Sequence, residues 1–281
     1  MLRTRVLTAL CLVPLVLAAL MLLSPRAWGV AVLAVFLIAA NEWGRLSRMA
    51  GPSRILLVAV LLLAGLGLLY LPAAGFGRGW PAALLVGSLG VSGLFWLLVA
   101  PLWVQGRWPT DGPGTMAVCG WVVLLGAWMA IVELQARSPW LALAAMAIVW
   151  IADTAAYFAG RAFGRKKLAP EISPGKTWEG VYGGLTAVAL YAMLLLFLAN
   201  RAGWAPMMDF FAIVTWLGAM LVIAAISVIG DLFESLMKRH AGVKDSGALL
   251  PGHGGILDRI DALLAAMPLA ALAAQFFLVK A

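Results

Sequence analysis

The sequence predicts an all-α, polytopic integral membrane protein with about nine transmembrane helices, and its composition carries this prediction. Hydrophobic residues make up 64% of the 281 positions and another 30 are glycine; a soluble domain is only roughly 45–50% apolar. Charged residues are 11%, against roughly 25% in soluble proteins. This balance excludes a soluble enzyme, a disordered chain and a disulfide scaffold. Residues 1–281 are therefore expected to form a single membrane domain.

Nine apolar stretches divide the chain, most of them close to the roughly 20 residues that a helix needs to cross a bilayer. The first follows Arg3 and Arg5 as in a signal peptide, but it is too long for one and no cleavage site follows. We expect a retained helix. The second reaches a full span only if Asn41 to Trp43 are included. In order, the stretches are Val6–Leu23, Ala27–Ala40, Ile55–Ala74, Pro81–Val104, Met116–Val132, Trp140–Phe158, Val181–Ala199, Phe210–Phe233 and Ile256–Val279.

The lysines and arginines choose the orientation, because these residues are retained on the cytoplasmic side of a membrane. With the N-terminus in the cytoplasm, fifteen of the 20 basic residues fall inside, and nine spans put the C-terminus outside. Topology thus accounts for most of the net charge of +8, which does not indicate nucleic acid as a partner. The basic residues left outside are Arg26, Arg78, Arg137, Arg201 and Lys280.

The carboxylates indicate where a site lies, since the retention of basic residues does not explain them. Ten of the 12 acidic residues fall on or beside the cytoplasmic side, and most of them gather in two polar segments, Asp153–Gly180 and Asp231–Asp261. We therefore expect the catalytic part at approximately residues 150–265. The ten are Glu42, Asp111, Asp153, Glu171, Glu179, Asp231, Glu234, Asp245, Asp258 and Asp261.

In the first polar segment, Asp153 lies inside the sixth apolar stretch, and an ionisable group at that depth indicates function. The alternative is an internal ion pair with a basic residue of another helix. The following loop is basic, and Arg165, Lys166 and Lys167 fit either a substrate phosphate or the anionic lipid of the inner leaflet equally well.

Gly175-Lys176-Thr177 resembles the end of a phosphate-binding P-loop. That motif needs glycine where this chain has Pro170, and no strand is expected before it. Ser173, Lys176 and Thr177 still have the chemistry to bind phosphate oxygens just before a helix that is expected near Val181.

The second polar segment is richer in carboxylates. If the eighth apolar helix continues past the membrane boundary, Asp231, Glu234, Ser235 and Lys238 share one of its faces. Asp258 and Asp261 share a face of the last helix, directly after a run of glycines. One such carboxylate could simply complement the helix dipole, but the pair, with lysines nearby, is suited to holding magnesium against phosphates. His253 could donate to a phosphate or fix its own loop.

These residues resemble the signature of the phosphatidate cytidylyltransferases, the CDP-diacylglycerol synthases. The second segment matches as Ser235-x-x-Lys238-Arg239-x-x-x-x-Lys244-Asp245 and Pro251-x-His253-Gly254-Gly255-x-x-Asp258-Arg259-x-Asp261. The first segment matches as Asp153-Thr154-Ala155-Ala156-Tyr157, Gly160-Arg161 and Ile172-Ser173-Pro174-x-Lys176-Thr177-x-Glu179-Gly180. The N-terminal half supports the resemblance by hydropathy alone.

The resemblance implies transfer of a cytidylyl group from CTP to phosphatidic acid, giving CDP-diacylglycerol and pyrophosphate. It also implies a homodimer and a divalent metal at Asp231 and Asp258. We expect magnesium there, with Asp261 as third ligand or support, and the scheme leaves room for a second, monovalent cation. The charged residues predict an active site at the cytoplasmic face, and we expect the protein in the bacterial inner membrane. Two alternatives stay open, a cytidylyltransferase for another lipid phosphate and a transporter of phosphorylated anions.

Within this scheme a subset of the residues in the two polar segments receives an expected role. Catalytic roles are expected for Asp231, Asp258, Lys244 and Lys176. Contacts with the two substrates are expected for Asp153, Ser173, Thr177, Ser235, Lys238, Arg239, Asp245, His253, Gly254, Gly255 and Arg259.

Overall fold

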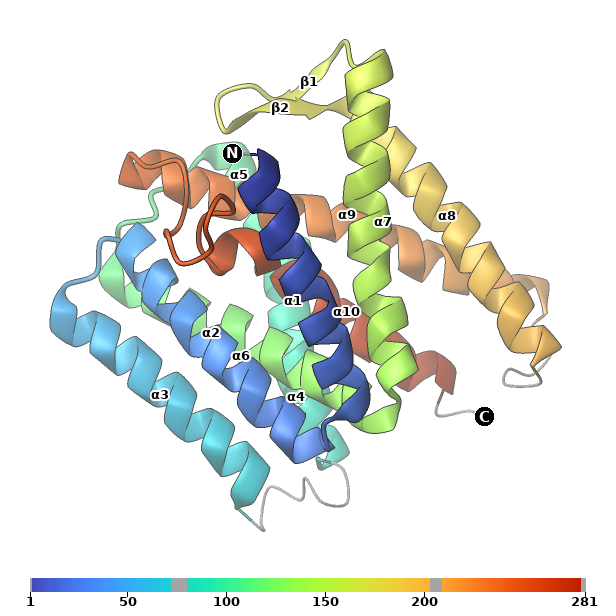
Figure 1. Cartoon of the computed structure of the whole chain (residues 1–281), viewed down its shortest axis with the longest axis horizontal. Helices are drawn as coiled ribbons and strands as arrows, with labels where there is room; N and C mark the ends of the chain where they lie inside the picture. The colour runs from blue at the N-terminus through green and yellow to red at the C-terminus, as the bar shows by residue number, and fades with distance from the viewer. Residues whose placement is uncertain (1, 72–79, 203–208, 279–281) are drawn as a thin grey trace.

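A computed structural model describes residues 2–71, 80–202 and 209–278. These residues form a bundle of long helices with one small hairpin at its edge (Figure 1). In chain order the elements are α1 (Leu2–Leu22), α2 (Pro25–Leu46), α3 (Gly51–Tyr70), α4 (Ala82–Leu94), the π-helical turn η3 (Phe95–Val99), α5 (Ala100–Gly106), α6 (Pro113–Arg137), α7 (Pro139–Phe163), β1 (Lys167–Ala169), β2 (Ser173–Thr177), α8 (Trp178–Arg201), α9 (Phe210–Ala241) and α10 (Leu257–Leu278).

Within the described ranges, eight helices are long and apolar enough to cross a membrane. They are α2, α3, the continuous segment Ala82–Gly106, α6, α7, α8, α9 and α10. This confirms the predicted all-α polytopic membrane protein. Helix α1 occupies the place of the first predicted span. The total of nine spans and the cytoplasmic N-terminus remain predictions.

Local sequence explains where several helices begin and end. Proline occupies the first turn of α2, α3, α6 and α7, where its fixed φ suits a helix and its missing N–H costs nothing. Asp209 caps α9 by accepting a hydrogen bond from the amide of Ala212, and Gly242 ends the same helix with a φ of 75°. Helix α9 therefore continues well past Asp231, as predicted.

Two elements differ from the sequence prediction. The second apolar stretch is a complete helix, Pro25–Leu46, which extends beyond Trp43 and carries Glu42. The first polar segment contains an antiparallel hairpin, in which Lys167 lies opposite Thr177, although no strand was expected there. Pro170 and Pro174 explain the difference, since each favours extended backbone at the residue before it and stops a helix from continuing.

Helix α9 is held in place by an aromatic cluster and by a close helix crossing. Phe233 is 1% exposed, and such ring contacts add about 0.5–1.5 kcal/mol each beyond burial. On the α10 side, a Cβ at Gly230 would lie 2.6 Å from the carbonyl oxygen of Asp261, so only glycine permits this approach. Both contacts lie next to the polar face of α9. The ring centroids 5.7–5.9 Å from Phe233 belong to Trp43, Phe95, Trp96 and Trp103.

Candidate active site

The polar face of α9 is the centre of the candidate site. Ser235 Oγ donates a hydrogen bond to Asp231 Oδ1 at 3.2 Å, and Lys238 Nζ lies 2.5 Å from Glu234 Oε2. Both contacts span four residues, so the predicted shared face is present. Glu234 is only 3% exposed, and a carboxylate so buried needs a cation beside it. Lys238 supplies that cation.

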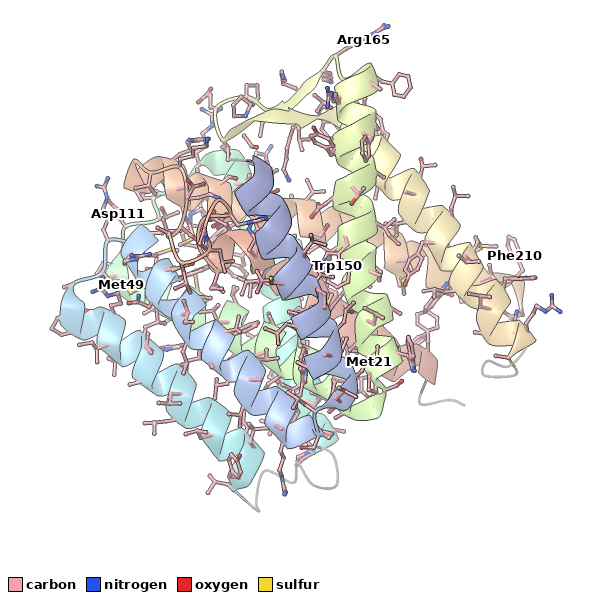
Figure 2. The ribbon with its side chains drawn as sticks, in the orientation of Figure 1. Met21, Met49, Asp111, Trp150, Arg165 and Phe210 are labelled. Carbon is pink, nitrogen blue, oxygen red and sulfur yellow. The ribbon has the colours of Figure 1, made fainter. Side chains whose placement is uncertain are left out.

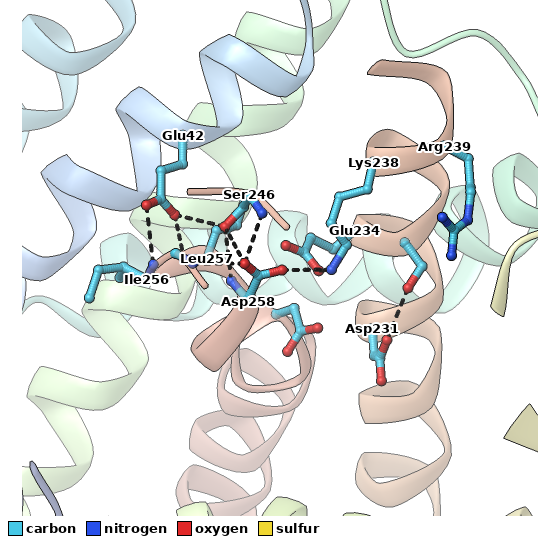
Figure 3. A network of polar contacts seen from close by, with 12 residues as sticks. Glu42, Asp231, Glu234, Lys238, Arg239, Ser246, Ile256, Leu257 and Asp258 are labelled. Atoms are coloured by element: carbon cyan, nitrogen blue, oxygen red, sulfur yellow. Dashed lines mark hydrogen bonds and ion pairs between the residues drawn. The ribbon is translucent and has the colours of Figure 1, made fainter. Parts of the chain in front are cut away.

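Asp258 joins α9 to α10 and to the loop between them (Figure 3). Its Oδ1 accepts a hydrogen bond from Lys238 Nζ at 2.7 Å. Its Oδ2 accepts hydrogen bonds from the backbone amides of Ser246 and Gly255, each at 2.8 Å. As the second residue of α10, Asp258 also lies where the helix dipole favours a negative charge. Hydrogen bonds from Lys238, Ser246 and Gly255 thus hold the Asp258 carboxylate in one orientation.

The hairpin brings a second lysine to the site. Lys176 Nζ, on β2, lies 2.6 Å from Asp231 Oδ2 on α9. The hairpin is tied to α9 again where Arg239 Nε donates to the carbonyl oxygen of Ile172 at 3.0 Å. An ion pair of Glu171 with Arg107, beyond α5, holds its turn. These contacts place the phosphate-binding candidate of the first polar segment beside the carboxylates of the second.

Two further carboxylates lie within electrostatic reach of this pair. Asp153, on α7, interacts with Lys176 and Asp231. Asp261, on α10, interacts with the same two residues and with Lys238. The intramembrane carboxylate predicted from hydropathy therefore belongs to the same cluster. The ion-pair alternative required a basic residue of another helix, whereas the cation that acts on Asp153 is Lys176 of the hairpin, whose direct ion pair is with Asp231.

Other candidates are placed less centrally. Thr177 is buried, and its hydroxyl accepts the amide hydrogen of Gly180 as the N-cap of α8. The backbone amide of His253 donates a hydrogen bond to the carbonyl oxygen of Leu250. Its side-chain Nδ1 is buried without a hydrogen-bond partner among the described residues.

The remaining candidates are placed as follows. Ser173 is half-buried on β2. Gly254 has a φ of 84°. Lys244, Asp245 and Arg259 are exposed.

The basic turn between α7 and the hairpin points away from the cluster. Arg165 projects outward at the end of the molecule (Figure 2), and Lys166 and Lys167 are exposed. The backbone of this turn is tied to the start of α8, because the amides of Arg165 and Lys166 donate hydrogen bonds to the Glu179 carboxylate. Of the two interpretations of these side chains, this placement favours contact with anionic lipid.

Glu42 and Ser246 belong to the polar network but were not predicted as part of the site, and Glu234 was predicted only to share a face of α9. Glu42 was counted among the cytoplasmic carboxylates but received no role, because it lies in α2, far from the two polar segments in sequence. The available signal was a carboxylate close to an apolar stretch, which is costly unless it is paired. Ser246 Oγ lies 2.9 Å from both Glu42 Oε2 and Asp258 Oδ2.

The carboxylates fit magnesium by chemistry. Among the described residues, no group of three or more His, Cys, Asp or Glu side chains is already arranged around a metal position. Magnesium, however, is commonly held by one or two carboxylates, with substrate phosphates and water completing its shell. Asp231 and Asp258 offer such oxygens, and both now contact a lysine ammonium group. A bound cation would compete with these lysines, which are the groups suited to bind phosphate instead.

Comparison with known proteins identifies the family. The model of the cytidylyltransferase family matches residues 3–277. The chain is 38% identical to a phosphatidate cytidylyltransferase of Pseudomonas aeruginosa, over 95% of both chains. The chain belongs to the cytidylyltransferase family. A phosphatidate cytidylyltransferase of Haemophilus influenzae is 36% identical over 95% of this chain and 96% of its own. One of Thermotoga maritima is 44% identical over 45% of this chain.

Family membership confirms the resemblance that the two polar segments predicted, and with it a nucleotidyltransferase embedded in a membrane. It also extends that resemblance to the N-terminal half, because the match begins at residue 3. Helix α2, with Glu42, therefore lies within the residues that the family model matches.

Proposed function

We propose that this cytidylyltransferase transfers the cytidylyl group of CTP to phosphatidic acid, giving CDP-diacylglycerol and pyrophosphate. The names of the relatives in Pseudomonas aeruginosa and Haemophilus influenzae support phosphatidate as the acceptor. The observation that carries the proposal is the paired arrangement of Lys176 with Asp231 and Lys238 with Asp258. It combines cations for phosphate with carboxylates for a metal ion in one cluster.

The reaction asks for alignment and charge neutralisation more than for a strong base. An oxygen of the lipid phosphate forms a bond to the α-phosphorus of CTP, and the bond from that phosphorus to the oxygen bridging to the β-phosphate breaks. Pyrophosphate leaves with the electron pair. The lipid phosphate is already an anion near neutral pH, so no proton has to be removed from it. Positioned cations lower the barrier by stabilising the charge on the phosphoryl oxygens.

The residues of the cluster suit these tasks. Lys176 and Lys238 would bind phosphate oxygens of the two substrates, each turning from the carboxylate that it now contacts. Arg239 and the exposed Lys244 would hold the outer phosphates, and Gly254 and Gly255 would let the backbone approach them. Asp231 and Asp258, with Asp261 beside them, would hold magnesium. When bound, that ion would neutralise triphosphate charge and favour departure of pyrophosphate.

The decisive experiment is an assay of the purified protein with CTP, magnesium and phosphatidic acid, with CDP-diacylglycerol detected by mass spectrometry. We expect product only when all three are present. A parallel reaction with an ether-lipid phosphate separates the related activity, since product from that acceptor alone would reassign the substrate. Movement of phosphorylated anions across proteoliposomes without chemistry would instead identify a transporter. Absence of product beside an active control enzyme contradicts the proposal.

Cation requirement, assembly and location form the remaining part of the proposal. Chelation should stop the reaction and magnesium should restore it, and a titration with potassium tests for a second, monovalent cation.

We propose a homodimer, which light scattering of the detergent complex checks. The eight apolar helices of the described ranges and the bacterial relatives support an inner-membrane protein. The gathered carboxylates support a site at its cytoplasmic face.

A further inference from the structure

Glu42 is a buried carboxylate in the N-terminal half of the chain, outside both polar segments. It lies in the last turns of α2 and is 3% exposed. Burying an ionised carboxylate is costly unless hydrogen bonds compensate for the lost water. The contacts of Glu42 therefore indicate what its burial serves.

Among the described residues, the donors to the Glu42 carboxylate belong to the loop before α10 and to the start of that helix (Figure 3). Oε2 accepts from the backbone amide of Leu257 at 2.8 Å and from Ser246 Oγ at 2.9 Å. Oε1 accepts from the backbone amide of Ile256 at 3.2 Å. The first amides of a helix have no partner within it. Here a different helix supplies one.

Ser246 links Glu42 to Asp258. Its hydroxyl lies 2.9 Å from both carboxylates and can donate its one hydrogen to either. Its backbone amide donates to Asp258 Oδ2, and its carbonyl oxygen accepts from Arg45, one turn after Glu42. Helix α2 thus holds the loop segment that fixes Asp258.

We propose that Glu42 is a positioning residue of the active site, which holds Ser246 and the first amides of α10 so that Asp258 keeps its orientation. This inference rests on the proposed function for its catalytic consequence. Glu42 lies on the side of Asp258 opposite Lys238 (Figure 3), so it acts on Asp258 through Ser246 and the backbone. It gives the N-terminal half an indirect part in the chemistry, beyond membrane packing.

The test replaces Glu42 by glutamine, which keeps the size but turns an NH2 group toward donors. We expect kcat to fall by about 10- to 100-fold, the range typical of residues that hydrogen-bond to a metal ligand and orient it. The KM values for CTP and lipid should change by less than about threefold. Glu133→Gln is the matched control, because Glu133 is also a buried carboxylate but pairs with Arg137. Its kcat should stay at the wild-type value.

Hydrogen exchange provides a readout that does not depend on turnover. In Glu42→Gln, amides of residues 246–258 should exchange faster, while the rest of the protein and its unfolding temperature match Glu133→Gln. A fall in kcat without faster exchange in this segment would overturn the positioning role, and so would unchanged kinetics. If the wild-type protein makes no CDP-diacylglycerol, the proposed function fails, and unaltered exchange in Glu42→Gln would independently refute the contact with the loop.

A double-mutant cycle tests the link through the serine and remains available if Glu42→Gln folds poorly, because Glu42→Asp can replace it. Ser246→Ala removes the hydroxyl between the carboxylates. If Glu42 acts through Ser246, the double variant should be no slower than the slower single variant within about threefold. Multiplication of the two losses would show independent effects and contradict the proposal.

Discussion

Lys176 Nζ and Asp231 Oδ2 lie 2.6 Å apart, although the whole of α8 separates the two residues in sequence. The contact joins the hairpin to α9, so it links the phosphate-binding candidate of one polar segment to the metal-binding candidate of the other. An ammonium group paired with a carboxylate can exchange that partner for a phosphate when a metal ion takes its place. The pair is therefore the most direct target for testing the site.

Asp231→Asn should lower turnover by at least about 100-fold, because it removes the charge that we expect to hold both the metal ion and Lys176. Formation of CDP-diacylglycerol measures the effect. Asp209→Asn is the control, since Asp209 caps the start of the same helix and asparagine caps equally well. Asp258→Asn should be as damaging as Asp231→Asn. Retained activity in both variants would show that the metal position is wrong.

Lys176→Met should also slow the reaction by about 100-fold and raise the KM for CTP, because a phosphate-binding cation is lost. Lys166→Met changes an exposed lysine just before the hairpin and should leave the kinetics unchanged. Steady-state rates over a range of CTP concentrations check both. Equal losses in the two variants would indicate a general effect of basic charge near the membrane, and no loss in Lys176→Met would remove this residue from the site.

Lys238 is expected to matter for stability as well as for activity. Its side chain is 14% exposed, and it pairs with Glu234 and Asp258, whose side chains are 3% and 4% exposed. Lys238→Met leaves two buried carboxylates without their cation, which should cost about 3–5 kcal/mol. Arg107→Met breaks an ion pair that is more than half exposed and should cost no more than about 1 kcal/mol. Thermal unfolding in detergent compares the two.

A second change tests whether the lost charge is the cause. Adding Glu234→Gln to Lys238→Met neutralises one of the uncompensated carboxylates, so the unfolding temperature should rise part of the way back. If it falls further instead, packing of the lysine side chain explains the loss better than its charge does.

Sequence reasoning succeeded where the signal is local and periodic. The apolar stretches predicted the membrane helices, and the spacing of Asp231, Glu234 and Lys238 predicted their shared face. It missed the hairpin, because two short strands with prolines carry no hydrophobic alternation. It gave Glu42 no role because the contact partners, Ser246 and Leu257, lie some two hundred residues away in sequence, and only the packed helices bring them together.

The number of spans remains open to a direct test. Nine spans with a cytoplasmic N-terminus predict that a reporter fused after Ala281 reads as external, while one inserted beside Asp111, in the loop between α5 and α6, reads as cytoplasmic. The two fusions control each other, because they should give opposite results. A cytoplasmic signal from both would mean that the prediction contains one span too many or too few between them.

Gly255→Ala probes the contact between α2 and the loop from the opposite side. A Cβ at this position would lie less than 3.0 Å from Ser246 Oγ and from both Glu42 carboxylate oxygens, so the loop must shift and carry the Asp258 hydrogen bonds with it. We expect a loss of kcat at least as large as in Glu42→Gln. Gly90→Ala is the matched control, because a Cβ there meets nothing within 4 Å, and alanine should stabilise α4 by up to about 1 kcal/mol. Full activity in Gly255→Ala would mean that the loop tolerates displacement and that Asp258 does not depend on this contact.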